Sequence, residues 1–368
     1  MNMVSRLELY RGCLLGMAIG DALGYTVDER SREQIRQDYG PHGLMGYDLV
    51  NGYADISSYT QLAAYACNAL LLGLTRGQMQ GVMAPYVRYI ALGEREWAQG
   101  QRYRTGPERI FCWISRNRAL RSRRCMDTRM LDTINRDRPG SMEEPRNRYN
   151  STGAITVAVP VGLFFNPART ERTEIDRLGA EAIALTHGDP QTFLVGSVIA
   201  HMIGRIIWDR VTDLKELARE ACTSLQEQFG REYHQTVEIR EKINLALALT
   251  ISPAIRPSDA MEQLGCDTAA TVLAGALYAA IMHGDDFDLA VTTAVNHSGR
   301  SAACGAVTGA LLGAMAGERG LPDFYLEPLE HGEILRELAE DMYTGCPMEL
   351  GSRMFDDEWD RKYIHGGA

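Results

Sequence analysis

Acidic, histidine and arginine side chains beside apolar runs are the groups in this sequence that suit catalysis or ligand binding, among them two aspartates, one histidine and one arginine. Asp21 and Asp28 lie seven residues apart after an apolar stretch, His187 precedes an apolar run, and Arg300 precedes another. A carboxylate can act as a general base, and an imidazole can move a proton near neutral pH. A guanidinium stays charged at any biological pH and pairs with phosphate or carboxylate. As a single histidine before an apolar helix, His187 fits a hydrogen-bonded structural role equally well.

The cysteines do not form a recognisable metal or disulfide motif. Eight are scattered along the chain, with no C-x-x-C pair and none of the spacings of a structural zinc site. Several stand inside apolar helical runs, where a thiol behaves as a small core side chain. This usage indicates a reducing compartment, so we expect a cytoplasmic protein with no metal ligands among its cysteines.

The overall composition excludes several classes of protein. The chain has 368 residues, of which 45% are hydrophobic and 23% charged, and its formal net charge is -10. These values are typical of a soluble globular protein and argue against disorder. The negative net charge gives no positive electrostatic field to hold the phosphate backbone of a nucleic acid. The apolar runs 269–282 and 302–316 are shorter than the roughly 20 residues that a helix needs to span a bilayer. We expect neither a nucleic-acid nor a membrane partner.

Apolar residues recur at helical spacing through most of the chain. The windows are 7–24, 58–74, 81–92, 191–208, 213–229, 235–249, 268–282, 287–294, 301–317 and 332–343. The β-branched run 155–165 is the one strand-like segment, and Pro160 within it argues against a central strand. No repeat, low-complexity tract or linker stands out. The pattern predicts an all-α fold in a single domain over residues 1–368.

Two of the predicted helices have a glycine at every fourth position. The first has Gly12, Gly16, Gly20 and Gly24, and the second has Gly305, Gly309, Gly313 and Gly317. Each interior glycine costs about 0.5–1 kcal/mol relative to alanine, so close approach of helix backbones must offset this cost. We expect both helices in the crowded centre of a bundle, packed against each other, with their polar ends meeting at a common site. The alternative is a pair of small-residue core helices with no site nearby.

Two further segments differ from the rest of the chain. Residues 102–148 contain 13 arginines, no lysine and 6 acids, and read as short helices joined by loops. Such a surface suits a diphosphate or an acidic partner, although we favour a solvated face with local pairing of arginines and acids. The C-terminal tail, 344–368, is aromatic and charged near its end. It suggests either a docking segment or, as we prefer, a wrap over the bundle surface.

An ordered set of motifs resembles the ADP-ribosylglycohydrolase family. The set comprises 20–24 (GDALG), 60–61 (TQ), 186–189 (THGD) and 294–296 (AVN), within a resemblance that covers roughly residues 7–318. The family includes dinitrogenase-reductase-activating glycohydrolase and the ADP-ribosylarginine and ADP-ribosylserine hydrolases. The resemblance implies a compact orthogonal bundle of a dozen or more helices. In active members two magnesium ions at the helix ends help cleave the bond between ADP-ribose and a protein side chain.

The positions that match the family's metal ligands have lost their acids. The motif of Thr or Ser, two Asp and Thr appears here as Ser57-Ser58-Tyr59-Thr60, and Gly-Gly-Asp-Thr-Asp-Thr appears as residues 298–303, SGRSAA. Asp28 remains, where the family's hydrolases often have Glu. Magnesium requires octahedral oxygen coordination, and a guanidinium at position 300 would repel it. We therefore predict no dinuclear magnesium site and no cofactor.

Each replaced residue also has a purely structural interpretation. Ser58 and Gln61 match a capping box, so Ser58 is a candidate N-cap, and Arg300 could form a salt bridge with Asp21 or Asp28. The ring of Tyr59 could fill the space of an ion. His187 matches a ribose-contacting histidine in parts of the family, with Asp189 as its acceptor or as a helix cap.

The substrate loop of the family is altered as well. A Gly-Asn-Gly segment before Met-Arg and Pro supplies backbone N–H groups to ADP-ribose, and the matched stretch here is 151–157, STGAITV, ahead of Val159-Pro160. One of the two glycines is kept and the Met-Arg pair is absent. Backbone donors do not depend on side-chain identity, so a ribose phosphate can still be bound. From this resemblance the ligand-binding candidates are Arg300, His187, Ser57, Ser58, Tyr59, Thr152, Gly153 and Ser301.

Three functions follow as hypotheses. The first is a pseudoenzyme whose cleft binds ADP-ribose, a nucleotide or a protein partner without cleavage, with Arg300 pairing with a phosphate or carboxylate. The second is a metal-independent hydrolase of ADP-ribosyl or other N-glycosidic bonds, with Asp28 or Asp21 as the general base and Arg300 stabilising the leaving group. The third is a structural role, as in the lens crystallins that resemble this family.

Overall fold

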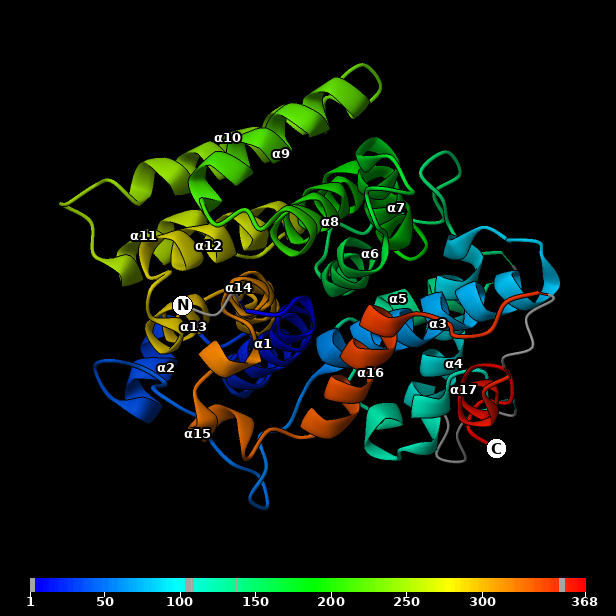
Figure 1. Cartoon of the computed structure of the whole chain (residues 1–368). Helices are drawn as coiled ribbons and strands as arrows, with labels where there is room; N and C mark the ends of the chain where they lie inside the picture. Colours follow the sequence, from blue (N-terminus) through cyan, green and yellow to red (C-terminus); the bar gives the residue numbers. More distant parts are fainter. Residues whose placement is uncertain (1–3, 103–106, 108, 137, 351–354) are drawn as a thin grey trace.

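A computed structural model describes residues 4–102, 107, 109–136, 138–350 and 355–368 (Figure 1). Within these residues the chain forms α-helices and four short 3-10 helices, with two isolated β-bridges and no strand. The predicted all-α class is confirmed. The α-helices are α1 Arg6–Val27, α2 Arg32–Tyr39, α3 Ser58–Gln80, α4 Tyr86–Arg102, α5 Thr128–Ile134, α6 Ala158–Phe164, α7 Arg172–Ala184, α8 Pro190–Asp209, α9 Leu214–Phe229, α10 Gln235–Leu249, α11 Pro257–Leu264, α12 Ala269–Met282, α13 Phe287–Val295, α14 Ser301–Ala316, α15 Asp323–Leu326, α16 Gly332–Thr344 and α17 Asp357–Tyr363. The 3-10 helices are η1 Trp113–Arg116, η2 Ala119–Arg121, η3 Ile155–Val157 and η4 Glu318–Gly320.

The centre of the bundle is the pair α1 and α14, which share the most extensive helix contact in the protein and lie side by side in Figure 1. Their glycine stripes face each other. A Cβ added at Gly20 would lie 1.9 Å from the carbonyl oxygen of Gly305, and one at Gly24 would lie 2.4 Å from Cα of Ala302. The predicted packing of the two glycine-striped helices is confirmed, and only glycine permits backbones this close.

The other helices surround this pair in two groups. Helices α6–α10 and α11–α13 lie on one side, and α3, α4 and α16 lie on the other (Figure 1). Helix α8 is long and apolar enough by length and composition to cross a membrane, but 83% of its most apolar window is buried inside the protein. That burial is what a core helix of a bundle requires.

The strand-like run 155–165 is helical. It forms η3 and then α6, with Pro160 as the third residue of α6. Proline is tolerated in the first turn of a helix because the N–H groups there have no partner within the helix. The predicted helix 81–92 is displaced, since α4 begins at Tyr86 and continues to Arg102.

The described parts of the two unusual segments pack onto the bundle. In the arginine-rich segment, Arg124 pairs with Glu330, and Arg102 pairs with Asp132 at 2.7 Å. In the tail, Trp359 Nε1 donates to Thr75 Oγ1 at 2.9 Å, which ties α17 to α3. Residues 103–106, 108, 137 and 351–354 of these two segments lie outside the described residues.

Candidate functional site

Asp21 anchors the start of α3. Its fully buried carboxylate accepts hydrogen bonds from Ser57 N at 2.9 Å, Ser57 Oγ at 2.5 Å, Thr60 N at 3.1 Å and Thr60 Oγ1 at 2.6 Å. Burial raises the pKa of Asp21, and these four donors oppose the rise. Because both carboxylate oxygens are occupied by α3, this side chain holds two helices together.

The N-terminus of α3 differs from the prediction. Ser57 is the N-cap, and its hydroxyl oxygen accepts from Tyr59 N at 3.1 Å. Ser58 Oγ instead accepts from Met126 N at 3.1 Å, and Gln61 Nε2 donates to two carbonyls of the segment 119–122. The predicted Ser58–Gln61 capping box is therefore wrong, because long-range partners use both side chains.

Tyr59 lies buried between α3 and the segment 151–157. Its hydroxyl and Thr152 Oγ1 are 2.6 Å apart, and its carbonyl oxygen accepts from Thr156 Oγ1 at 2.7 Å. The phenol ring therefore fills space where the family motif has a small acid, and its polar end is satisfied by a threonine.

Asp28 and Arg300 meet at the N-terminus of α14. Asp28 Oδ1 accepts from Ala302 N at 2.9 Å, and Arg300 Nη1 lies 3.6 Å from Asp28 Oδ2. Arg300 also pairs with Glu29. Burial raises the pKa of Asp28 to about 6, although the Ala302 N–H and the guanidinium favour the carboxylate. Of the two aspartates predicted as partners of Arg300, the structure selects Asp28.

Ser301 begins α14 as a buried residue. Its hydroxyl lies 3.4 Å from the carbonyl oxygen of His297, to which it donates. The polar end of α14 is thus formed by Asp28, Arg300 and Ser301.

His187 is buried in a chain of hydrogen bonds. Its Nε2 lies 3.0 Å from Ser151 Oγ, and its Nδ1 lies 2.8 Å from Thr186 Oγ1. Ser151 donates its own proton to Asp127, so its oxygen accepts from the His187 Nε2–H. Burial lowers the pKa of His187 to about 4, which keeps the ring neutral. Ser151 lies between Asp127 and His187, and its hydroxyl proton points to Asp127. His187 therefore does not act as a base on Ser151. Asp189 caps α8, accepting from Gln191 N at 2.9 Å.

Asp127, like Glu29, is a residue of this site that the sequence analysis did not identify. It caps α5 through the N–H of Arg129 at 3.1 Å and pairs with the Arg129 side chain. Although burial opposes ionisation, hydrogen bonds from Arg129 and Ser151 lower the pKa of Asp127. In the sequence, Asp127 stands among the short helices of the arginine-rich segment. That position does not indicate that Ser151 links Asp127 to His187.

Gly153 lets the segment 151–157 pack closely against Asp127 and His187. An added Cβ would lie 3.1 Å from Cβ of Asp127 and 3.3 Å from Cε1 of His187. A side chain at this position would therefore be in tight contact with Asp127 and His187. The predicted site residues come from the end of α1, the start of α3, the segment 151–153, the loop before α8 and the start of α14. Contacts join Asp21 to Ser57, Tyr59 to Thr152 and Asp28 to Arg300.

Few oxygens at this point are open to a metal. Among the described residues, Asp28 Oδ2 is buried without a hydrogen bond, while Asp21 uses both oxygens on α3. This oxygen of Asp28 and the exposed carboxylate of Glu29 both lie beside a permanent cation, Arg300. Magnesium takes six oxygen ligands, usually with at least one or two carboxylates.

Comparison with known proteins shows the family. The profile of the ADP-ribosylglycohydrolase family, described as "ADP-ribosylglycohydrolase", matches residues 2–350. This chain belongs to the ADP-ribosylglycohydrolase family. A solved structure titled "ADP-ribosylglycohydrolase-related protein complex" superposes with a TM-score of 0.56 at 21% identity, covering 92% of this chain and 98% of that one. A protein of Archaeoglobus fulgidus, described as uncharacterized, is 24% identical over 341 residues, 91% of this chain and 96% of its own length.

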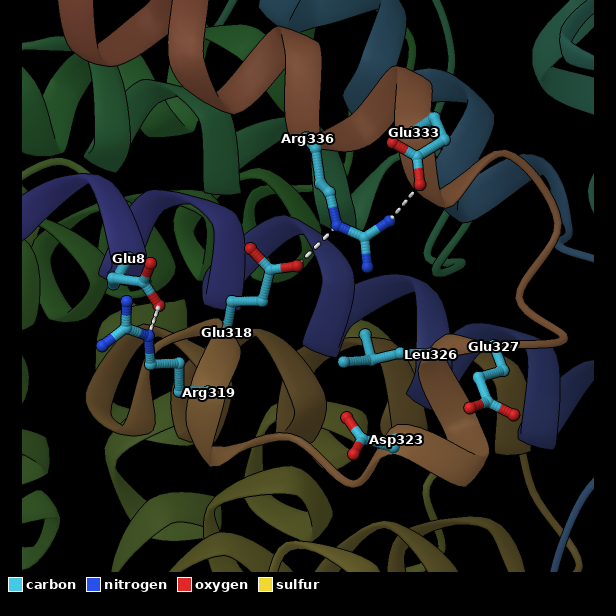
Figure 2. Close-up of a pocket in the computed structure, with 8 residues that line it drawn as sticks. All are labelled: Glu8, Glu318, Arg319, Asp323, Leu326, Glu327, Glu333 and Arg336. Atoms are coloured by element: carbon cyan, nitrogen blue, oxygen red, sulfur yellow. Dashed lines mark hydrogen bonds and ion pairs between the residues drawn. The ribbon is translucent and has the colours of Figure 1, made fainter.

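Two of the cavities in the described part of this ADP-ribosylglycohydrolase-family protein contain clustered arginines and lie away from the site. One, of about 480 Å³, lies between α1, η4, α15 and α16, where Arg336 pairs with Glu318 and Glu333 and Arg319 pairs with Glu8 (Figure 2). The other cavity has a volume of about 560 Å³. Its lining includes Arg88, Arg95, Arg138 and Arg146, and Glu144 is the single acid among the lining residues. Neither cavity contains a predicted site residue.

Proposed function

We propose that this member of the ADP-ribosylglycohydrolase family is a pseudoenzyme that binds an anionic ligand of the ADP-ribose or nucleotide class at Arg300 and does not hydrolyse it. The observation that supports this proposal most directly is the guanidinium of Arg300 beside Asp28 at the N-terminus of α14. Its charge stands where active members of the family hold magnesium with acids.

The carboxylate inventory supports a site without magnesium. Asp21 is engaged by four donors from α3, and Asp28 accepts from the N-terminus of α14. A cation bound to Asp28 would be repelled by the positive charge of Arg300, which lies 3.6 Å from the Asp28 carboxylate. Two divalent ions would bring four positive charges to a place where the carboxylates of Asp28 and Glu29 already face the guanidinium of Arg300, so we infer that magnesium is not used.

The arrangement around Arg300 also suits a phosphate. Its side chain is 23% exposed, and its partner Glu29 is 62% exposed. An ion pair with so exposed an acid contributes little free energy, so an incoming phosphate can replace Glu29. The N-terminus of the 16-residue α14 adds a favourable partial charge at the same place.

Calorimetry with ADP-ribose tests the binding proposal. We expect binding of equal affinity with and without magnesium, and a loss of about 10- to 100-fold for Arg300→Gln, because a charge-assisted contact to phosphate is worth roughly 1.5–3 kcal/mol. Glu29→Gln should tighten binding, since it removes the competing carboxylate. Arg319→Gln, an exposed arginine outside the site, is the matched control and should change nothing.

Hydrolysis is tested separately with peptides ADP-ribosylated on arginine or serine. We expect no release of ADP-ribose with magnesium or with EDTA. Magnesium-dependent release by the purified wild-type protein would overturn the proposal. A folded protein that binds neither ADP-ribose nor a nucleotide would favour a structural role or a protein partner instead.

One observation favours a metal-independent hydrolase as the second candidate. The pKa of Asp28 is raised to about 6, near the range in which a carboxylate works well as a general base, and its Oδ2 lacks a hydrogen bond among the described residues. If this candidate is right, release of ADP-ribose proceeds in EDTA and Asp28→Asn abolishes it. If the pseudoenzyme proposal is right, Asp28→Asn leaves ligand binding nearly unchanged.

A further inference from the structure

Behind the candidate site, three side chains with metal-binding atoms meet in the core. Cys266 precedes α12, His297 follows α13, and Cys304 lies in the first turn of α14. One ligand atom of each lies within 4.8 Å of the others, and the three residues are 0 to 1% exposed. They are 31 and 7 residues apart in the sequence, which matches no zinc motif, so only the fold brings them together.

The packing of α12 leaves space for both sulfurs. An added Cβ at Gly275 would lie 2.4 Å from Cys266 Sγ and 3.2 Å from Cys304 Sγ. The two thiols therefore converge over the same point of one helix. A side chain of any size at position 275 would occupy the space between them.

His297 has an unsatisfied nitrogen at this cluster. Its Nε2 is buried and has no hydrogen-bond partner among the described residues, whereas Nδ1 accepts from Gly299 N at 2.9 Å. The backbone carbonyl of Ala294, three residues earlier, lies beside the ring as a second acceptor. A buried polar nitrogen without a partner costs roughly 1–3 kcal/mol, so Nε2 is the nitrogen of His297 that is free to bind an ion.

We propose that Cys266, His297 and Cys304 bind one thiophilic d10 ion, Zn²⁺ or Cu⁺, through two thiolates and an imidazole nitrogen. Thiolate and imidazole donors select such ions over magnesium, which prefers oxygen. When Nε2 binds the ion, the ring proton resides on Nδ1, with the Ala294 carbonyl as acceptor, and Gly299 N–H gives up its acceptor. Both thiols lose their protons on binding.

The cluster is connected to the candidate site through one backbone hydrogen bond. Arg300 N donates to the carbonyl oxygen of Cys266 at 2.8 Å. An ion between residues 266 and 304 would therefore stiffen the loop 297–300 that presents Arg300. This role is independent of whether ADP-ribose is the ligand there.

Metal content of the wild-type protein tests the proposal. We expect protein purified without chelators from zinc- or copper-supplemented cells to contain about one ion per chain, and the double variant Cys266→Ser/Cys304→Ser to contain less than about a tenth of that. Mass spectrometry of the metal distinguishes zinc from copper. Cys222→Ser, another buried cysteine on α9, is the matched control and should keep its ion.

Cobalt substitution keeps the test decisive if the double variant does not fold. Wild-type protein refolded with Co²⁺ should show a thiolate-to-cobalt charge-transfer band, which carboxylate sites cannot produce, and His297→Ala should shift or abolish it. Absence of bound metal and of this band in folded wild-type protein would overturn the proposal. So would a Cys266–Cys304 disulfide in protein isolated under reducing conditions.

Discussion

Gly16 of α1 and Gly309 of α14 are in direct backbone contact. A Cβ added at Gly16 would lie 2.3 Å from the Gly309 carbonyl oxygen, and one added at Gly309 would lie 1.9 Å from the Gly16 carbonyl oxygen. This contact sets the distance between the two helices whose ends form the candidate site, because Asp28 follows α1 and Arg300 precedes α14.

Gly16→Ala and Gly309→Ala should each destabilise the protein. The added methyl group has only rigid backbone to displace, so we expect a loss of about 3 kcal/mol or more in the free energy of unfolding. Urea denaturation measures this loss. Gly46→Ala, where an added Cβ meets nothing within 4 Å, is the control and should change stability by less than about 0.5 kcal/mol. Equal stability of all three variants would contradict the close packing.

Asp21→Asn should destabilise the junction of α1 and α3. The amide NH₂ of asparagine cannot accept a hydrogen bond, so at least one of the four bonds from Ser57 and Thr60 is lost. We expect a loss of about 2–4 kcal/mol at pH 7, measured by thermal or urea unfolding. The control is Asp38, an exposed acid that pairs with Arg30. Asp38→Asn should lower the free energy of unfolding by less than about 1 kcal/mol.

Glu94 on α4 predicts an unusual pH dependence of stability. It is fully buried, Oε1 has no hydrogen bond among the described residues, and burial raises its pKa to about 8. The folded state therefore holds the proton more tightly than the unfolded state. The resulting stability is fully present below about pH 4.5 and is lost as pH rises through about 8, a change on the order of 5 kcal/mol.

Glu94→Gln should remove this dependence. The variant should exceed the wild type in melting temperature by a margin that grows from pH 5 to pH 8. Glu96→Gln is the control on the same helix, and it should destabilise at all these pH values because Glu96 accepts from Phe111 N at 2.7 Å and Cys112 N at 3.1 Å. A margin that stays constant with pH would show that Glu94 does not titrate in this range.

Restoring the family's acids should create a magnesium site. The quadruple variant Ser58→Asp/Tyr59→Asp/Arg300→Asp/Ala302→Asp returns four carboxylates and removes the guanidinium. We expect millimolar magnesium to raise its melting temperature, with about 2.7 kcal/mol gained at a hundredfold excess over Kd, and to leave the wild type unchanged. The matching quadruple Asn variant has the same shapes without the charges. An equal magnesium response in that variant would contradict the charge argument.

The sequence by itself determined the features that depend on local order along the chain. Helical periodicity predicted the all-α class, glycines four apart predicted that α1 and α14 pack closely, and the ordered motifs indicated the family. The same holds for the absence of acids at positions 58, 59, 300 and 302, since a residue's identity needs no coordinates. These properties were readable because they follow from spacing along one helix or from one position in a motif.

The tertiary structure alone decided which groups are partners. It assigned Arg300 to Asp28 and Glu29 while α3 occupied Asp21, and it made Ser57 the N-cap of α3. It also brought Asp127 to His187 through Ser151. A hydrogen bond or ion pair forms with whichever group lies within about 3 Å after packing, and side chains tens or hundreds of residues apart compete for that place. The local sequence does not indicate which of these groups ends up in contact. For the same reason the cluster of Cys266, His297 and Cys304 could be identified only from the fold.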